Sequence, residues 1–410
     1  MWRLDIRSFI VTLVALAIGP FAYAQNTVTY SCILRSNFGD QTMWDGESFR
    51  VYGITSTINE PPHAPAATLF CNEGDSMVLN TLSFSQGDHH TIHLHGLDVD
   101  TRNDGDPATS FSLSHLQDTT YSFRADHAGT YLYHCHVGDV VHVQMGMYGL
   151  LVVRAAGGVN TAWTGGPAYD QEKNWITSEM DRSWHDTIPV HDDEQDTLHI
   201  PPYRPDYFLI NGKSHQELMD DDIRISAAVG EKVYLRMGNI GFFTNRVVLP
   251  SEVDAEVIDS DGRPIPNAFF TDTLDMMPGE RYGVLLTPLQ EFDGVLAMGY
   301  VDMDTDSLWD TQDVPIHVQG TIGYDEPAFG AGAVIYPNPA WEHITLRLPP
   351  TMSAIAHHLT VSDVLGRPMI WERYATDVPV DMKALPSGAY TLRLFDRSGV
   401  RLLAEGFLRE

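Results

Sequence analysis

The residues best suited to chemistry stand close together between positions 133 and 149. One thiol, three imidazoles and two thioethers fall within fifteen residues, namely His134, Cys135, His136, His142, Met145 and Met147. A thiolate and two imidazoles, completed by a long and weak thioether bond, form the ligand set of an electron-transfer copper. Cys135 would supply the thiolate, His142 one imidazole and Met147 the axial sulfur. Met145 is the alternative axial ligand.

A second histidine cluster lies upstream, in the run His90-Thr91-Ile92-His93-Leu94-His95-Gly96. Both stretches are predicted to be extended, and successive side chains of a strand point to opposite faces. His93 and His95 therefore share a face, and His90 lies on the other. In the same way, the histidines on either side of Cys135 point away from its thiol. His89 adjoins this cluster and is predicted to be exposed rather than a ligand.

This alternation predicts two metal sites on the two faces of the same strands. The first comprises His90, Cys135, His142 and Met147, and the second comprises His93, His95, His134 and His136. Because the main chain joins Cys135 directly to both neighbouring histidines, an electron at the first site would have a short bonded route to the second.

The two motifs together resemble the multicopper oxidase branch of the cupredoxin family. There, a His-x-x-His-x-His-Gly strand and a His-Cys-His strand, followed by a spaced His and Met, build a type 1 copper beside half of a trinuclear cluster. The resemblance extends to Asp104-Gly105 and to the Gly-Met-Tyr-Gly run at 146–149. It implies copper as the cofactor and O2 as the electron acceptor. The six residues between Cys135 and His142 exceed the four of many members, and we interpret them as subfamily variation.

Asp104 has two interpretations. In the family, an acid at this place sits near the cluster and relays protons to reduced oxygen, and each oxygen intermediate needs protons as electrons arrive. Alternatively, Asp104-Gly105 is simply a turn, for which this dipeptide is well suited.

Composition narrows the partners and the compartment. The chain has 410 residues and a net charge of -30, which disfavours nucleic acid and anionic membranes as partners. Residues 1–24 read as a secretory signal peptide, and no later segment is apolar enough to span a membrane. Export permits a disulfide between Cys32 and Cys71, and the sequence leaves this pairing open.

Short strands punctuated by turns predict an all-β fold. We expect a copper-binding cupredoxin-like Greek-key barrel or sandwich at 25–156 and a second at 157–323. The run from Ala228 to Arg236 echoes that from Cys71 to Asn80, which suggests a duplication. A small β-sandwich at 331–410 resembles the C-terminal sorting domain of cargo of the type IX secretion system. That resemblance implies the type IX machinery as a partner, transit through the periplasm, and delivery to the cell surface or medium.

The second copy lacks the metal chemistry, and its Met298 and Met303 read as core residues rather than ligands. The family builds its cluster from eight histidines, of which this chain shows four. The missing half would come from another protein or from a dimer of first domains, or the four histidines would hold a single copper. The resemblance also allows a homo-oligomer such as a trimer. The leading hypothesis is an oxidase that accepts electrons from a small molecule or a metal ion. The alternatives are a nitrite-reductase-like enzyme and a non-enzymatic blue-copper or copper-binding surface protein.

Overall fold

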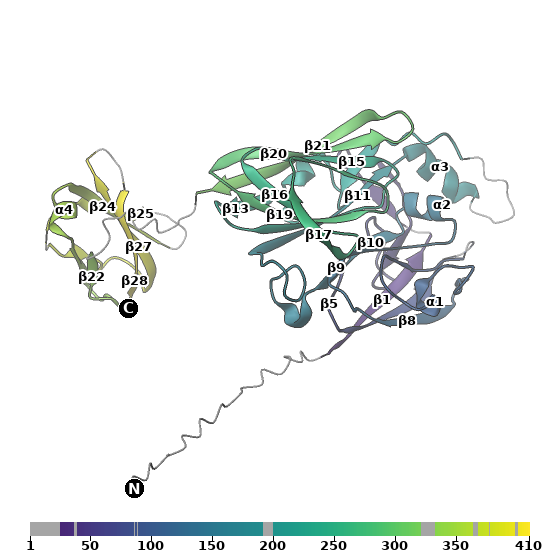
Figure 1. Cartoon of the computed structure of the whole chain (residues 1–410), viewed down its shortest axis with the longest axis horizontal. Coiled ribbons are helices and arrows are strands. Elements are labelled where there is room, and N and C mark those ends of the chain that lie inside the picture. The colour runs from purple at the N-terminus through teal and green to yellow at the C-terminus, as the bar shows by residue number, and fades with distance from the viewer. Residues whose placement is uncertain are drawn as a thin grey trace, which may run out of the picture. The chain divides into compact units, whose positions relative to one another are not determined.

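The computed structural model describes residues 25–36, 39–85, 87, 89–191, 200–320, 333–363, 368–376, 378–397 and 401–410. The predicted signal peptide lies outside these residues. The chain divides into two compact units, Met1–Gly320 and Thr321–Glu410, and both are built from strands (Figure 1). The predicted all-β class is confirmed. No helix among the described residues has the length and apolarity needed to cross a membrane.

The N-terminal sandwich packs two four-stranded sheets against each other, with strand orders β4-β1-β6-β8 and β5-β10-β9-β7. The strands of the first sheet are β1 (Thr27–Arg35), β4 (Gly53–Thr55), β6 (Ser76–Ser83) and β8 (Asp118–Arg124). Those of the second are β5 (Leu69–Asn72), β7 (His93–His95), β9 (Gly129–His134) and β10 (Tyr148–Arg154). Pairing is parallel between β1 and β6 and between β5 and β10, and antiparallel elsewhere.

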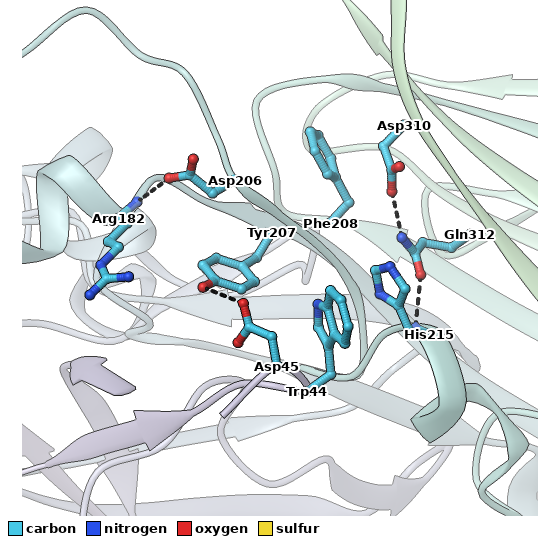
Figure 2. A pocket seen from close by; sticks show the side chains of 9 residues that line it. All are labelled: Trp44, Asp45, Arg182, Asp206, Tyr207, Phe208, His215, Asp310 and Gln312. Carbon is cyan, nitrogen blue, oxygen red and sulfur yellow. Dashed lines mark hydrogen bonds between the residues drawn. The ribbon is translucent and has the colours of Figure 1, made fainter. Parts of the chain in front are cut away.

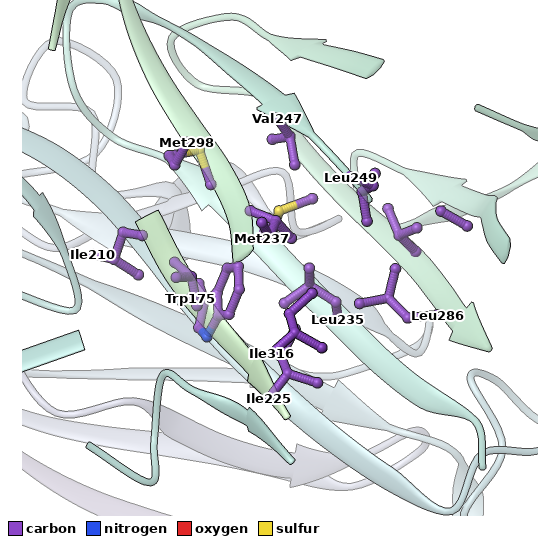
Figure 3. Close-up of a cluster of buried hydrophobic side chains, with 14 of the residues drawn as sticks. Trp175, Ile210, Ile225, Leu235, Met237, Val247, Leu249, Leu286, Met298 and Ile316 are labelled. Atoms are coloured by element: carbon purple, nitrogen blue, oxygen red, sulfur yellow. The ribbon is translucent and has the colours of Figure 1, made fainter. Parts of the chain in front are cut away.

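The middle sandwich follows in the same unit, with sheets ordered β12-β11-β14-β19-β16-β17 and β13-β21-β20-β15-β18. The first sheet comprises β11 (Gln171–Met180), β12 (Tyr207–Ile210), β14 (Val233–Asn239), β16 (Val253–Ser260), β17 (Arg263–Phe270) and β19 (Arg281–Pro288). The second comprises β13 (Ile225–Ala228), β15 (Thr244–Val248), β18 (Thr273–Met276), β20 (Phe292–Asp302) and β21 (Ser307–Gln319). Between the sheets lies an apolar core that includes Trp175, Met237 and Met298 (Figure 3). Met298 is a core residue as predicted, whereas Met303 is 56% exposed.

The two sandwiches repeat one topology, which bears out the internal echo in the sequence. β11 pairs in parallel with β14 just as β1 does with β6, and β13 pairs in parallel with β21 just as β5 does with β10. The echoed segments occupy equivalent places, since they cover β5 with β6 and β13 with β14. Parallel pairs formed by distant segments in both sandwiches are what a duplicated Greek-key unit predicts.

Short helices and a hairpin connect strands of the sandwiches. The hairpin pairs β2 (Asp40–Thr42) with β3 (Ser48–Arg50). The helices are α1 (Thr101–Asp104), α2 (Asp139–Gln144) and α3 (Arg182–His191), and the short 3-10 turns are η1 (Ala156–Gly158) and η2 (His215–Met219). Cys32 and Cys71 are buried free thiols, so the disulfide that the sequence left open is not formed. Burial raises the pKa of each thiol to about 12.

A buried interface joins the N-terminal and middle sandwiches. An apolar cluster draws Leu132, Val143 and Leu150 from the first together with residues of β11 and β12 from the second. Beside it, the fully buried Arg236 donates to Thr130 Oγ1 at 3.4 Å and lies 3.5 Å from a Glu172 carboxylate oxygen. A buried cation needs such partners because it has lost its water. The contact fixes β14 of one sandwich against β9 of the other, and β9 leads into Cys135.

Glu179 is a buried ionisable residue at this interface, and it makes stability depend on pH. One carboxyl oxygen accepts from the Phe242 N–H at 2.8 Å, whereas the other has no hydrogen-bond partner among the described residues. Burial raises its pKa from 4.5 to about 7. The folded protein therefore keeps a proton that the unfolded chain releases near pH 4.5. The stabilisation is complete below that pH and is lost as pH rises through about 7.

We expect Glu179→Gln, which stays neutral, to remove this pH dependence. Between pH 4.5 and 7 the free energy of unfolding of the wild type, relative to that of the variant, should fall by roughly 1 kcal/mol per pH unit. Urea unfolding curves of both proteins across this range measure it. Parallel profiles for the two proteins would contradict an uncharged Glu179.

The C-terminal unit is a small sandwich of its own, as predicted. One sheet comprises β22 (Val334–Tyr336), β23 (His343–Arg347) and β26 (Val380–Asp381). The other comprises β24 (Ala356–Asp363), β25 (Pro368–Arg373), β27 (Gly388–Asp396) and β28 (Arg401–Arg409). A short helix, α4 (Pro350–Ser353), precedes β24. The buried apolar side chains of the C-terminal unit form a separate core, which includes Ile344, Leu359 and Leu392.

Candidate metal centre

A thiol-centred group of three side chains forms where the end of β9 meets α2. The Cys135 Sγ lies 3.2 Å from His142 Nδ1 and 3.7 Å from His90 Nδ1. All three residues are buried, with exposures of 0 to 1%. His90 is held by a bridge to Leu113, just before β7, and its Nε2 has no hydrogen-bond partner among the described residues. Both imidazoles thus turn the same ring nitrogen toward one sulfur.

The six residues between Cys135 and His142 contain a helical turn that the sequence did not predict. Gly138 caps α2 with a left-handed backbone (φ 55°), and its carbonyl accepts from His142 N–H at 2.9 Å. The turn brings His142 back over Cys135. A longer spacing is compatible with a compact site because one helical turn absorbs the extra residues.

Both candidate thioethers lie in the buried core around the thiol. The main chain of Met147 bonds to two residues of the thiol-centred group, since it donates to the His142 carbonyl and accepts from Cys135 N–H, each at 3.0 Å. The Met145 carbonyl accepts instead from Tyr52 N–H at 2.7 Å. Both side chains lie in the same buried core as the thiol, and the choice of Met147 as the axial ligand stays a prediction.

The electrostatics of Cys135 suit a soft metal ion. Burial by itself raises the pKa of the thiol, yet the two imidazoles bring that pKa well below its usual value. A low-pKa thiol beside histidines is the thiolate form that binds metals. One sulfur and two imidazole nitrogens, completely desolvated and beside a buried thioether, are the donor set that copper prefers. The residues present therefore fit copper.

A second group, of three histidines, forms on the opposite side of the same strands. One ring nitrogen from each of His93, His95 and His134 lies within 4.8 Å of the others. His93 Nδ1 donates to the Asp104 carbonyl at 2.7 Å, and His134 Nδ1 donates to the Cys135 carbonyl at 2.9 Å. Such bonds fix the tautomer and leave Nε2 as the ligand atom.

His136, the fourth predicted member, lies at the edge of this group. Its ring centroid is 4.7 Å from that of His93, and its Nδ1 is 3.9 Å from Asp106 Oδ2. Asp104 closes α1, with Gly105 in the left-handed conformation after it, and its Oδ1 lies 3.6 Å from His93 Nδ1. It is thus both a turn residue and a neighbour of the histidines. His89 is exposed and bonds to Ser112 Oγ at 2.9 Å.

The middle sandwich adds residues that sequence reasoning missed. A Cβ at Gly279 would come within 3.3 Å of the His95 ring, and one at Gly96 would overlap the Arg281 guanidinium. Arg281 itself is 5% exposed and pairs with Asp261 at 2.9 Å. Asp261, Gly279 and Arg281 lie more than 160 positions from His95 along the chain, so no local sequence pattern predicts that they lie near it.

Burial also keeps the imidazoles of His95 and His134 neutral. Desolvation lowers the pKa of His134 to about 3, and desolvation followed by the charge of Arg281 lowers that of His95 to about 4. Neutral imidazole is the form that binds metals. Among the residues that the structure describes, these two groups are the sets of His, Cys, Asp or Glu side chains close enough to hold a metal ion.

Comparison with known proteins identifies the parts of the chain. Family models of multicopper oxidases match residues 53–157 and 174–300, and a model of the secretion system C-terminal sorting domain matches residues 334–401. An L-ascorbate oxidase of Cucumis sativus is 27% identical over 258 residues, which cover 56% of this chain and 42% of the relative. A copper-containing nitrite reductase of Neisseria meningitidis serogroup B is 26% identical over 205 residues, which cover 49% and 47%.

The chain spans less than half the length of both relatives. Among solved structures, the blue copper oxidase from Nitrosomonas europaea has a TM-score of 0.56 at 24% identity, covering 74% of this chain and 89% of that one. The copper nitrite reductase from the same organism has a TM-score of 0.54 at 19% identity, covering 72% and 94%. These likenesses establish the fold.

Both oxidase matches fall on the two sandwiches that pack together, and the first match contains every residue of the thiol-centred and histidine groups. The third match falls on the separate C-terminal sandwich. The chain therefore belongs to the multicopper oxidase family and has a secretion-system sorting domain at its C-terminal end.

Proposed function

We propose that this protein is a secreted copper-dependent oxidoreductase that takes electrons from a donor at the thiol-centred group and delivers them to the histidine group, with O2 as the acceptor. The observation that carries the proposal is the position of Cys135, whose sulfur faces His90 and His142 while its main chain continues into His134. Copper held by these groups would supply single-electron exchange at the first and oxygen chemistry at the second.

The chain itself offers two connections between the groups. The first is the covalent main chain from Cys135 to His134, which is one peptide bond long. The second is the hydrogen bond from His134 Nδ1 to the Cys135 carbonyl at 2.9 Å. Both end on the imidazole ring that would hold the acceptor metal. The connection stays rigid because Cys135 and His134 are buried and β9 pairs with β7 and β10.

Asp104 is the residue that we propose delivers protons to the histidine group. Its side chain is 36% exposed, so it can exchange protons with water, and its Oδ1 lies 3.6 Å from His93 Nδ1. A carboxylate in this position is within reach of both solvent and the metal ligands. Reduction of O2 to water consumes protons, which gives such a residue a role.

The remaining assignments follow from the sequence and the C-terminal match. We infer that residues 1–24 direct export and that the type IX system carries the protein through the periplasm to the cell surface or medium. The electron donor is a small molecule or a metal ion. Since four histidines are half of the family's set of eight, further ligands would come from another protein or from the first sandwich of a second copy of this chain.

One observation favours a second candidate, a nitrite-reductase-like enzyme with a single acceptor copper. The tight histidine group has three members, His93, His95 and His134, and three imidazoles suffice for one metal ion with an open position. Similarity to the copper-containing nitrite reductases supports it. A non-enzymatic copper-binding protein would use the thiol-centred group alone.

Copper content with electron paramagnetic resonance separates these candidates. We expect more than one copper per chain, with separate signals from a thiolate-bound and an imidazole-bound ion. Oxygen consumption with an added reductant would support the oxidase, and anaerobic loss of nitrite the alternative. A single thiolate-bound copper per chain, with neither activity, would refute both enzymatic candidates.

A further inference from the structure

A cavity of about 420 Å³ opens at the junction of the N-terminal and middle sandwiches, apart from both metal-binding groups (Figure 2). The loop between β2 and β3 supplies Trp44 and Asp45, and the middle sandwich supplies the opposite wall from β12, η2 and β21. No residue of the thiol-centred or histidine group lines it. The volume lies within the range of about 300–1,000 Å³ typical of small-molecule sites.

An aromatic platform forms one side of this cavity. The rings of Trp44 and His215 stack with their centroids 3.8 Å apart and their planes at 21° (Figure 2). A hydrogen bond holds the main chain of each residue. Gln216 Nε2 donates to the Trp44 carbonyl at 3.4 Å, and the His215 N–H donates to Gln312 Oε1 at 3.1 Å. Trp44 is nevertheless 37% exposed. A large aromatic side chain that is fixed but left open to the cavity is suited to stacking on a ligand.

The charge of the cavity is negative. Asp45, Asp206 and Asp310 line it, and none of the three forms an ion pair with a lysine or arginine among the described residues. Asp45 accepts from the buried Tyr207 hydroxyl at 3.2 Å, which fixes the carboxylate at the rim of the platform. The one guanidinium of the lining, that of Arg182, pairs with Glu47 at 2.6 Å. Three carboxylates against one neutralised cation favour a positively charged ligand.

The carboxylates are arranged around the cavity rather than converging on one point. The sets of side chains close enough to hold a metal ion, among the described residues, are the thiol-centred and histidine groups, and these three acids are in neither. A divalent cation needs several oxygens within about 2.0–2.6 Å. A cation with spread charge and a flat face matches the lining better, because it can stack on Trp44 while acids surround its edge.

We propose that this cavity binds a small planar aromatic cation. The ring of the ligand stacks against the Trp44–His215 platform, and its positive charge faces Asp45 and Asp310. Tyr207 and Phe208 also line the cavity. The site is independent of copper and of the oxidoreductase activity proposed above.

Binding of 1-methylquinolinium to the full-length protein tests this proposal. The probe is planar, permanently charged and not a reductant, so copper chemistry does not enter. Quinoline, its neutral counterpart at pH 7.5, is the matched control. Calorimetry should give saturable 1:1 binding of the cation, about tenfold tighter than that of quinoline and weakened by added salt. Equal affinity for the two probes, or no saturable binding, would overturn the proposal.

Variants locate the site. Trp44→Ala should weaken binding of the cation about tenfold, whereas Trp341→Ala, which removes an exposed tryptophan of the C-terminal unit, should leave it unchanged. The double variant Asp45→Asn with Asp310→Asn keeps the shape and removes charge, so it should lose the preference for the cation over quinoline. If Trp44→Ala fails to fold, the double variant still tests whether the cation binds in this cavity. Wild-type preference in the double variant would place the ligand elsewhere and refute the assignment.

Discussion

Replacing Cys135 by serine should abolish the intense blue absorption of the copper-loaded protein and lower its oxidase rate by more than about 100-fold. The thiolate–copper bond is the source of the colour, and a serine hydroxyl is neither soft nor ionised at neutral pH. Loss of an outer partner of a metal ligand already costs about 10- to 100-fold, so loss of the ligand itself should cost more. Visible spectra and oxygen uptake with a reductant measure both effects.

Cys71→Ser is the matched control because it removes another buried thiol of the same sandwich. Cys71 lies in β5, outside both metal-binding groups, and its thiol has a raised pKa of about 12. The blue absorption should persist in this variant. If Cys135→Ser kept the colour and the rate of the wild type, the thiol-centred group would not be the copper site, and the proposed function would fall with it.

Replacing His93 by alanine should separate the two groups. His93 is central to the histidine group, with its ring 4.7 Å from that of His136 and 5.2 Å from that of His134. It is not adjacent to Cys135, so the blue absorption should survive. The rate should fall by more than about 100-fold, and copper per chain should drop by at least one, because a three-imidazole site that loses one imidazole binds metal weakly.

The control for this variant is His89→Ala, which removes an exposed histidine four positions upstream. His89 bonds to Ser112 and belongs to neither group. Colour, copper content and rate should all match the wild type. A His93→Ala protein that turned over within about twofold of the wild type would show that the histidine group is not where the electrons go.

The segment from Cys135 to Met147 shows what a local sequence pattern can predict and what it cannot. The strand alternation in the two histidine runs sorts His93, His95 and His134 from Cys135, because neighbouring side chains on a strand must point to opposite faces. The same rule does not predict where the His142 side chain points, because His142 does not lie on a strand. Its approach to the thiol depends on α2 and on the left-handed Gly138 that begins it, and the six-residue spacing gave no sign of a helical turn.

In the middle sandwich, the sequence predicts the strands but not the residues that lie beside the histidine group. Its strands, its echo of the first sandwich and its buried Met298 follow from the sequence. Its contribution beside His95, through Gly279 and Arg281, does not. Nor do the proton on Glu179 and the cavity beside Trp44, because burial and cavities arise where segments distant in sequence pack together.

By itself, therefore, the sequence determined the fold class, the candidate donor residues and the face of those donors that lie on the two histidine-bearing strands. These depend on residue type and on the two-residue period of a strand, both of which are local. The tertiary structure decided which nitrogen of His90 and His142 meets the sulfur, and it lowered the pKa values of the buried His95 and His134. Distances and desolvation are properties of packed segments, and packing is fixed only when the whole chain has folded.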